Sequence, residues 1–230
     1  MRVRVREALT LAKALAVGGE RREAAVAIIT KPKNLFQPYT TTSANRYPDE
    51  FRAVADALTT ETPRILSFGC STGEELVSLR AAFPGASIHG VDVNPLAVRK
   101  ARRRVAGDAR TTVARGGEAP DASYDVVLAL AVFRHAALND APPSCAGVLA
   151  FADFDRTVGG LAASVRPGGL LVIRHANFRF SDTSAAAAFE VVSTGYASAG
   201  EGGLPTPLYD RDDRLIGVEP RDDGVYRRLS

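Results

Sequence analysis

The pattern of apolar and polar positions changes character near residue 60. Before it, apolar residues recur at helical spacing and predict helices over about 4–17, 20–28 and 49–58. After it, short apolar runs alternate with helical patterns, which is typical of a parallel sheet covered by helices on both faces. We therefore expect an N-terminal helical or lid segment, residues 1–60, and a Rossmann-like domain, residues 61–230.

The fold class that this alternation predicts is α/β, a doubly wound and mostly parallel Rossmann-like sheet. The stretches FEVVSTG, PTPLYDRDDRLIGV and VYRRL near the C-terminus are strand-like but have no helices of proper length between them. They predict antiparallel strands at the edge of the same sheet, with turns such as DRDD joining them.

The stretch ILSFGCSTGEEL, residues 65–76, carries the first chemical signal. It runs from a predicted strand into small residues, where Gly69 and Gly73 permit a tight turn and the close approach of a ligand. Asp92 ends the next predicted strand, 19 residues after Gly73. A carboxylate at that tip is placed to accept hydrogen bonds from ribose hydroxyls, so the sequence predicts a nucleoside site.

The charge beside this turn discriminates between nucleosides. Glu74 and Glu75 open the next helix, where they would repel a diphosphate but suit an ammonium or a sulfonium. S-adenosylmethionine is therefore favoured over NAD. Because Glu74 also fits a capping box with Ser71, it is as readily a cap as a ligand.

Four stretches resemble the ordered motifs of class I S-adenosylmethionine-dependent methyltransferases: ILSFGCSTGEE, HGVDVNP, YDVVLALAVF and VRPGGLLVI. The likeness spans about residues 63–178. CSTGEE resembles the chemotaxis-receptor (CheR-type) glutamate methyltransferases in particular, and TTTSANRYPDEF resembles their segment that places an Arg near the cofactor, here Arg46. Ser67 replaces the usual acid before the first motif glycine, and Ser71 replaces the middle glycine. Ala131 and His135 stand where the chemotaxis enzymes have an Asn and a Tyr.

The resemblance implies S-adenosyl-L-methionine as the cofactor. Glu75 or Glu74 would meet its methionyl ammonium, and Asp92 its ribose. The cofactor-binding residues that we expect are Arg46, Gly69, Cys70, Ser71, Gly73, Glu75, Asp92, Val93, Glu118, Ala129 and Leu130.

Residues after the fourth and fifth predicted strands are candidates for the acceptor side. A histidine there could take a proton near pH 7, so we predict catalytic roles for His135 and His175. Tyr47, Asn177 and Phe178 are the predicted substrate contacts. Loop or core packing is the alternative for each of these residues.

The net charge, the apolar stretches and the Cys and His spacing limit the classes of partner that we expect. The net charge of +3 is small, and the RKARRR run at 99–104 has no interleaved aromatics, so it predicts a solvated helix face and no nucleic-acid partner. No stretch is long and apolar enough for a membrane span. Two cysteines and three histidines without ligand spacing indicate no metal site, and cytoplasmic conditions are expected.

We therefore predict a methyltransferase that modifies an O or N atom, including a carboxylate, of a small molecule. The Arg and Ala usage is typical of a GC-rich bacterium and suggests specialised metabolism. Two alternatives stay open: a non-catalytic S-adenosylmethionine-binding module, and a methyltransferase that acts on a peptide, protein or RNA. The sequence indicates no oligomeric state.

Overall fold

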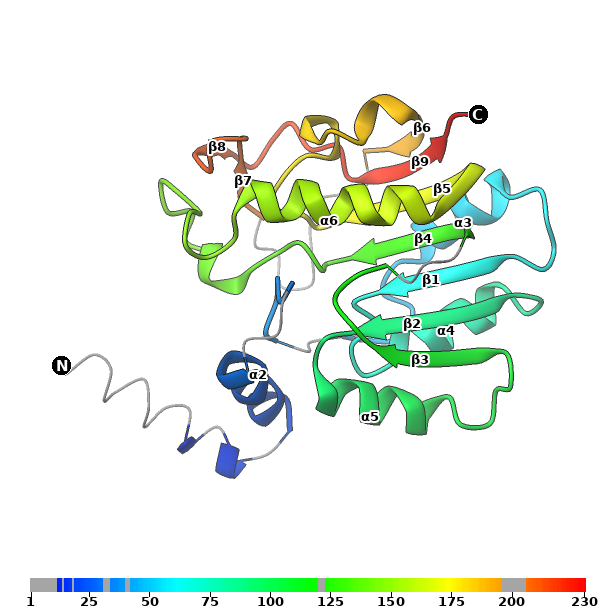
Figure 1. The fold of residues 1–230 in the computed structure, drawn as a ribbon, viewed down its shortest axis with the longest axis horizontal. Coiled ribbons are helices and arrows are strands. Elements are labelled where there is room, and N and C mark those ends of the chain that lie inside the picture. Colours follow the sequence, from blue (N-terminus) through cyan, green and yellow to red (C-terminus); the bar gives the residue numbers. More distant parts are fainter. Residues whose placement is uncertain are drawn as a thin grey trace.

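The computed structural model describes residues 12–13, 15–17, 19–30, 34–39, 42–119, 123–195 and 206–230. A seven-stranded sheet forms their centre, in the order β3-β2-β1-β4-β5-β9-β6 (Figure 1). Its first five strands in space are parallel: β3 (Thr111–Arg115), β2 (Ser87–Asp92), β1 (Arg64–Phe68), β4 (Tyr124–Leu130) and β5 (Val165–Arg174). β9 (Gly224–Arg228) pairs antiparallel with β5, and β6 (Phe189–Thr194) pairs antiparallel with β9.

Helices cover both faces of the sheet. α6 (Phe151–Ser164) packs on one face, and α3 (Pro48–Ala57), α4 (Glu74–Ala82) and α5 (Pro95–Arg104) contribute to the core on the other (Figure 1). α2 (Gly19–Thr30) precedes them in the chain. Short 3-10 turns cover Ala136–Leu138, Phe180–Asp182 and Ala186–Ala188. None of the helices in the described ranges is long and apolar enough to cross a membrane.

The strand β4 shows why the sheet is buried on both sides. All seven of its residues, YDVVLAL, are buried. Successive side chains of a strand point to opposite faces. Val127 and Ala129 accordingly join the core under α6, whereas Val126 and Leu128 join the core under α3 and α4. A continuous apolar run is what a central parallel strand requires.

The fold class predicted from the sequence is confirmed, with one correction at the C-terminal end. Residues 205–218 were expected at the edge of the main sheet, but β7 (Leu208–Tyr209) and β8 (Leu215–Gly217) form a separate two-stranded sheet. The backbone explains this, because Tyr209 N–H donates to Asn177 O and Leu215 N–H donates to Pro143 O. The predicted helix over 4–17 falls mostly outside the described residues.

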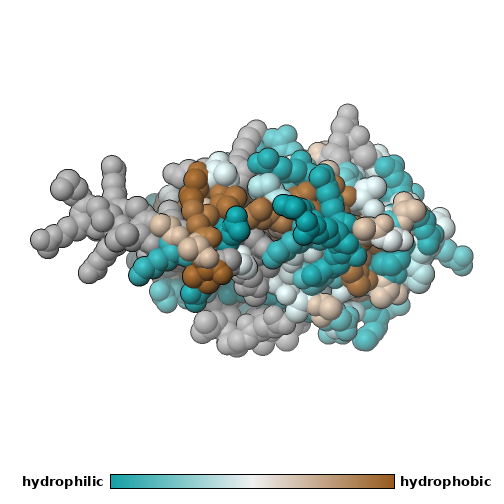
Figure 2. Space-filling view, turned by 90° about the horizontal axis from the view of Figure 1, so that it is seen from below, coloured by the Kyte–Doolittle hydropathy of each residue, from teal (hydrophilic) through white to brown (hydrophobic). Residues whose placement is uncertain are grey.

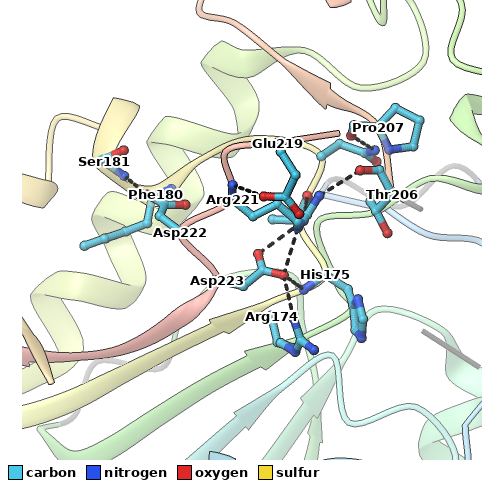
Figure 3. Close-up of polar contacts among 12 residues, drawn as sticks. Arg174, His175, Phe180, Ser181, Thr206, Pro207, Glu219, Arg221, Asp222 and Asp223 are labelled. Atoms are coloured by element: carbon cyan, nitrogen blue, oxygen red, sulfur yellow. Dashed lines mark hydrogen bonds and ion pairs between the residues drawn. The ribbon is translucent and has the colours of Figure 1, made fainter. Parts of the chain in front are cut away.

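A buried network of charges fixes the carboxyl end of β5 (Figure 3). Asp223 accepts from the Arg174 guanidinium, from Arg221 and from the His175 backbone N–H. On its other side, Arg174 forms an ion pair with Glu50 of α3, with Nε and Oε1 2.7 Å apart. The network thereby joins α3, β5 and the start of β9 beside the site described next.

Candidate active site

A cavity of about 300 Å³ lies at the carboxyl ends of β1, β2 and β4. The turn after β1, the tip of β2 and the loop after β4 supply part of its wall. Chain between residues 34 and 47 supplies the rest. Ligands of doubly wound sheets bind at this edge, which is where the sequence places the nucleoside site.

The turn after β1 approaches the loop after β4 closely. Gly69 has a φ of +76°, and a Cβ atom on it would lie 2.4 Å from Cγ2 of Val132. Only glycine fits this position. Gly69, Cys70 and Ser71 all line the cavity. The Cys70 thiol is buried, which raises its pKa well above the usual range, so it is no nucleophile.

Asp92, at the tip of β2, is held by the backbone on either side of it. Its Oδ2 accepts from Ser71 N–H and its Oδ1 from Asn94 N–H, each at 2.8 Å. Asn94 in turn caps α5 by accepting from Leu96 N–H. These two hydrogen bonds orient the Asp92 carboxylate, which lines the cavity.

Glu75, Arg46 and Tyr47 meet at another part of the cavity wall. Ser67 Oγ donates to Glu75 Oε1 at 2.7 Å, and burial raises the pKa of Glu75 to about 7 although Ser67 and Arg46 act against the shift. The Arg46 guanidinium lies 5.3 Å from the centre of the Tyr47 ring. Tyr47 is 6% exposed, and its hydroxyl has no hydrogen-bond partner among the described residues.

Some cavity residues were not predicted from the sequence. Asn34 connects the β3 side to α6, donating to Gly117 O at 2.6 Å and accepting from the Arg156 guanidinium at 3.0 Å. Phe36 packs edge-on against Phe133, with ring centres 5.0 Å apart. The unpredicted part of the wall comprises Asn34, Leu35, Phe36, Gln37, Tyr39, Thr42, Phe68, Asn94, Ala131, Val132, Arg134 and Ala136.

Three predicted cofactor residues do not line the cavity. Gly73 precedes α4 with a φ of +91°, and a Cβ on it would lie 2.9 Å from Ala101 Cα, so it serves the packing of α4 on α5. Ala129 is fully buried in the core. Glu118 is exposed. The other eight predicted cofactor residues all line the cavity: Arg46, Gly69, Cys70, Ser71, Glu75, Asp92, Val93 and Leu130.

Neither predicted catalytic histidine lines the cavity. His135 Nδ1 accepts from Ala137 N–H at 3.1 Å, and burial lowers its pKa. A neutral ring bonded in this way carries its proton on Nε2 and has no lone pair for a base. His175 is 4% exposed, and burial lowers its pKa to about 3. The geometry therefore does not support direct proton transfer by either ring.

Asn177 and Phe178, the other two predicted substrate contacts, do not line the cavity. Asn177 is fully buried; its Nδ2 donates to Pro207 O at 2.7 Å and its Oδ1 accepts from His135 N–H at 2.9 Å. Phe178 is also buried, and its ring packs against Phe151 at 5.4 Å between centres. Tyr47 is the predicted substrate residue that does reach the cavity.

The basic run at 99–104 lies on α5. Its charged side chains are exposed while Ala101 is buried, and the α5 side of the molecule shows a hydrophilic surface (Figure 2). Arg104 forms an ion pair with Glu74. Glu74 is therefore engaged at the α4–α5 contact and does not line the cavity. The described residues contain no group of three or more His, Cys, Asp or Glu that could hold a metal ion.

Comparison with known proteins adds to this geometry. Residues 66–171 match the family model described as a methyltransferase domain. The chain is 32% identical over 129 residues to the demethylmenaquinone methyltransferase of Thermus thermophilus, a stretch that covers 53% of this chain and 51% of that protein. The chain thus spans about half the length of the curated relative that it matches.

Solved structures with partial likeness include two methyltransferases. CalS10, an amino pentose methyltransferase from Micromonospora echinaspora bound to S-adenosylmethionine, is 22% identical, with 59% of this chain and 51% of that one covered and a TM-score of 0.45. A methyltransferase from Geobacter sulfurreducens in complex with S-adenosylhomocysteine is 23% identical, with 57% and 49% covered and a TM-score of 0.40.

The family match extends from β1 to β5 and so includes β1, β2 and β4, the strands whose carboxyl ends form the cavity. It includes the turn at Gly69, the acid Asp92 and Glu75 on α4. Residues 66–171 therefore resemble a methyltransferase domain.

Proposed function

We propose that this chain transfers a methyl group from S-adenosylmethionine to an O or N atom of a small molecule. The observation that carries the proposal is the convergence of Asp92, Glu75, Arg46 and Tyr47 on one cavity behind the Gly69 turn. When bound, the cofactor supplies a methyl group that its sulfonium makes electrophilic. The chain's own contribution is to bind, align and exclude water.

The cavity residues fit the cofactor group by group. Asp92 would accept from the ribose hydroxyls, with Val93 against the adenine. Glu75 would meet the methionyl ammonium and Arg46 the carboxylate.

The same charges argue against a dinucleotide. A diphosphate binds best at a helix N-terminus with exposed backbone N–H groups and no acid beside it. Here Glu75 faces the cavity from the first turn of α4, and an ionised carboxylate there would repel a phosphate. The site therefore suits a cationic nucleoside.

We propose that residues 1–60 serve as the lid of the Rossmann-like domain, residues 61–230. Residues between 34 and 47 line the cavity, and Asn34 is hydrogen-bonded to both Gly117 and Arg156. α3 anchors the segment, because Phe51 and Val54 are buried in the core. A segment held in this way would exclude water from the reacting atoms.

The small cavity favours a small-molecule acceptor over a protein or RNA chain. A bacterial cytoplasmic enzyme of specialised metabolism is consistent with the composition and the two buried thiols. A non-catalytic binding module is the second candidate, favoured by the position of His135 and His175 away from the cavity. In this proposal the resemblance of CSTGEE to the CheR-type enzymes supports only the identity of the cofactor, and the methyl acceptor is not taken from it.

The proposed function is tested by calorimetric titration of the full chain with S-adenosylhomocysteine at pH 8, with NADH as the control ligand. We expect a Kd on the order of 1–100 μM for S-adenosylhomocysteine, about −8 to −5 kcal/mol, and no comparable heat from NADH. Tighter binding of NADH, or no binding of S-adenosylhomocysteine, would overturn the proposal.

Cofactor affinity is expected to fall as the pH falls below 7. Glu75 has a pKa of about 7 in the ligand-free protein because burial raises it. The methionyl ammonium requires the ionised carboxylate, of which about nine-tenths is present at pH 8 and about one-tenth at pH 6. The Kd of S-adenosylhomocysteine should therefore rise about tenfold between these values.

The Glu75→Gln variant should lose this pH dependence and bind more weakly at pH 8. Glu74→Gln is the matched control, since Glu74 is the neighbouring acid but pairs with Arg104 outside the cavity. A pH dependence that survives in Glu75→Gln, or disappears in Glu74→Gln, would show that another group binds the ammonium.

A further inference from the structure

The loop after β4 turns one arginine toward the cavity. Ala131 has a φ of +57°, and Phe133 is fully buried among aromatic rings. Arg134 follows and lines the cavity wall. The ring of its neighbour His135 instead caps the next turn.

Arg134 pairs with no acid among the described residues. Its guanidinium donates to Asn139 Oδ1 at 3.2 Å, and no carboxylate lies within 4 Å of it in the part of the chain that the structure describes. Burial lowers its pKa, and the charges of Arg46 and Arg221 act in the same direction. A partly desolvated arginine beside two other cations is a favourable position for an anion.

The proposed function gives no cofactor group to Arg134. Among the described lining residues, Arg46 and Arg134 balance Glu75 and Asp92. The proposed function uses Glu75 and Arg46 for the methionyl group and Asp92 for the ribose. With the cofactor bound, its sulfonium would add one positive charge, and Arg134 would still lack a counter-ion.

We propose that the methyl acceptor is an organic acid whose anionic oxygen group is bound by Arg134. This inference rests on the proposed function and names the substrate class of the same site. A planar guanidinium pairs with a carboxylate through two parallel hydrogen bonds, which would fix the orientation of the acceptor. Phe36, Phe68 and Val132 line the same cavity and suit an apolar or aromatic remainder.

An anionic acceptor also explains how the site operates without a histidine in its wall. An ionised oxygen is attracted by the sulfonium, whereas a protonated amine would be repelled by the sulfonium, Arg134 and Arg46. The cavity thereby discriminates against cationic acceptors at neutral pH.

The test uses benzoate and its neutral analogue benzamide as probes, titrated by NMR into the full chain saturated with S-adenosylhomocysteine. We expect benzoate to bind at least about tenfold more tightly than benzamide, because the ion pair with Arg134 is partly desolvated. Arg134→Gln should remove this preference while the Kd of S-adenosylhomocysteine stays within about threefold. Arg134→Lys should keep part of it.

Arg52→Gln is the matched control, since Arg52 is an exposed arginine of α3 that pairs only with Asp49 among the described residues. Equal binding of the two probes, no binding of either, or an unchanged preference in Arg134→Gln would overturn the inference alone. A large loss of S-adenosylhomocysteine affinity in Arg134→Gln would also overturn it, because the arginine would then bind the cofactor's carboxylate. If the wild type binds no S-adenosylhomocysteine, the proposed function fails and this inference fails with it.

Discussion

Replacing Asp223 with alanine is expected to lower the free energy of unfolding by about 3–5 kcal/mol. Asp223 is 4% exposed and lies between two buried arginines, with Oδ2 3.1 Å from Arg174 Nη1 and Oδ1 3.2 Å from Arg221 Nη2. It also accepts from His175 N–H at 2.9 Å. The alanine variant would remove the carboxylate that pairs with the Arg221 and Arg174 guanidinium groups and would leave the buried His175 N–H without this acceptor.

Urea unfolding followed by circular dichroism measures this loss. Asp212→Ala is the control, because the Asp212 side chain is 73% exposed and its ion pair with Arg214 should contribute less than about 0.5 kcal/mol. The loss of unfolding free energy in Asp223→Asn, which keeps an acceptor oxygen, should fall between the losses in Asp223→Ala and Asp212→Ala. A change below about 1 kcal/mol in Asp223→Ala would mean that the network does not stabilise the end of β5.

The second large effect is expected at Asp92. Asp92→Asn should weaken S-adenosylhomocysteine binding about 100-fold or more, because a carboxylate that accepts from two ribose hydroxyls contributes about 1.5–3 kcal/mol per hydrogen bond. Asparagine has nearly the same shape, but its amide N–H₂ cannot accept from a hydroxyl or from Ser71 N–H.

A second ligand separates the ribose contact from damage to the turn. The wild type should bind S-adenosylhomocysteine more tightly than its 2′-deoxy analogue, and Asp92→Asn should bind both about equally. A variant that weakens both ligands but keeps the wild-type preference would mean that Asp92 only holds Ser71 and Asn94 in place.

The parts of the fold and site that the sequence predicted are those that local patterns specify. β4 is a continuous apolar run, and such a run suits only a central strand with both faces covered. The turn at Gly69 and the acid Asp92 each directly follow a strand, and parallel strands bring their carboxyl ends to one edge. Periodicity and position along the chain are therefore enough to place them together.

The parts that the sequence missed depend on contacts between distant residues. Asn34 is hydrogen-bonded to Gly117, 83 residues away, and nothing near Asn34 in the sequence indicates that contact. Asn177 bonds to His135 across 42 residues, so a polar residue expected at the acceptor is instead used to join two loops. Identifying Arg134 rather than His135 as the cavity residue required the backbone conformation of Ala131 and the burial of Phe133. Hydrophobic periodicity predicts neither of these features.

Glu75 shows how a departure from a motif can be compensated in space. The usual acid before the first motif glycine is replaced by Ser67, which the resemblance left unexplained. In the structure Ser67 Oγ donates to Glu75, so a carboxylate from α4 reaches the same strand end. A sequence pattern compares positions along the chain and does not detect such an exchange.

A crystal structure of the full chain with S-adenosylhomocysteine would show directly whether this cavity is the cofactor site. We expect the ribose hydroxyls to contact Asp92, the methionyl ammonium to contact Glu75, and the sulfur to face the wall formed by Leu130 and Arg134. S-adenosylhomocysteine bound elsewhere, or bound here with its methionyl group turned away from Glu75, would contradict this expectation.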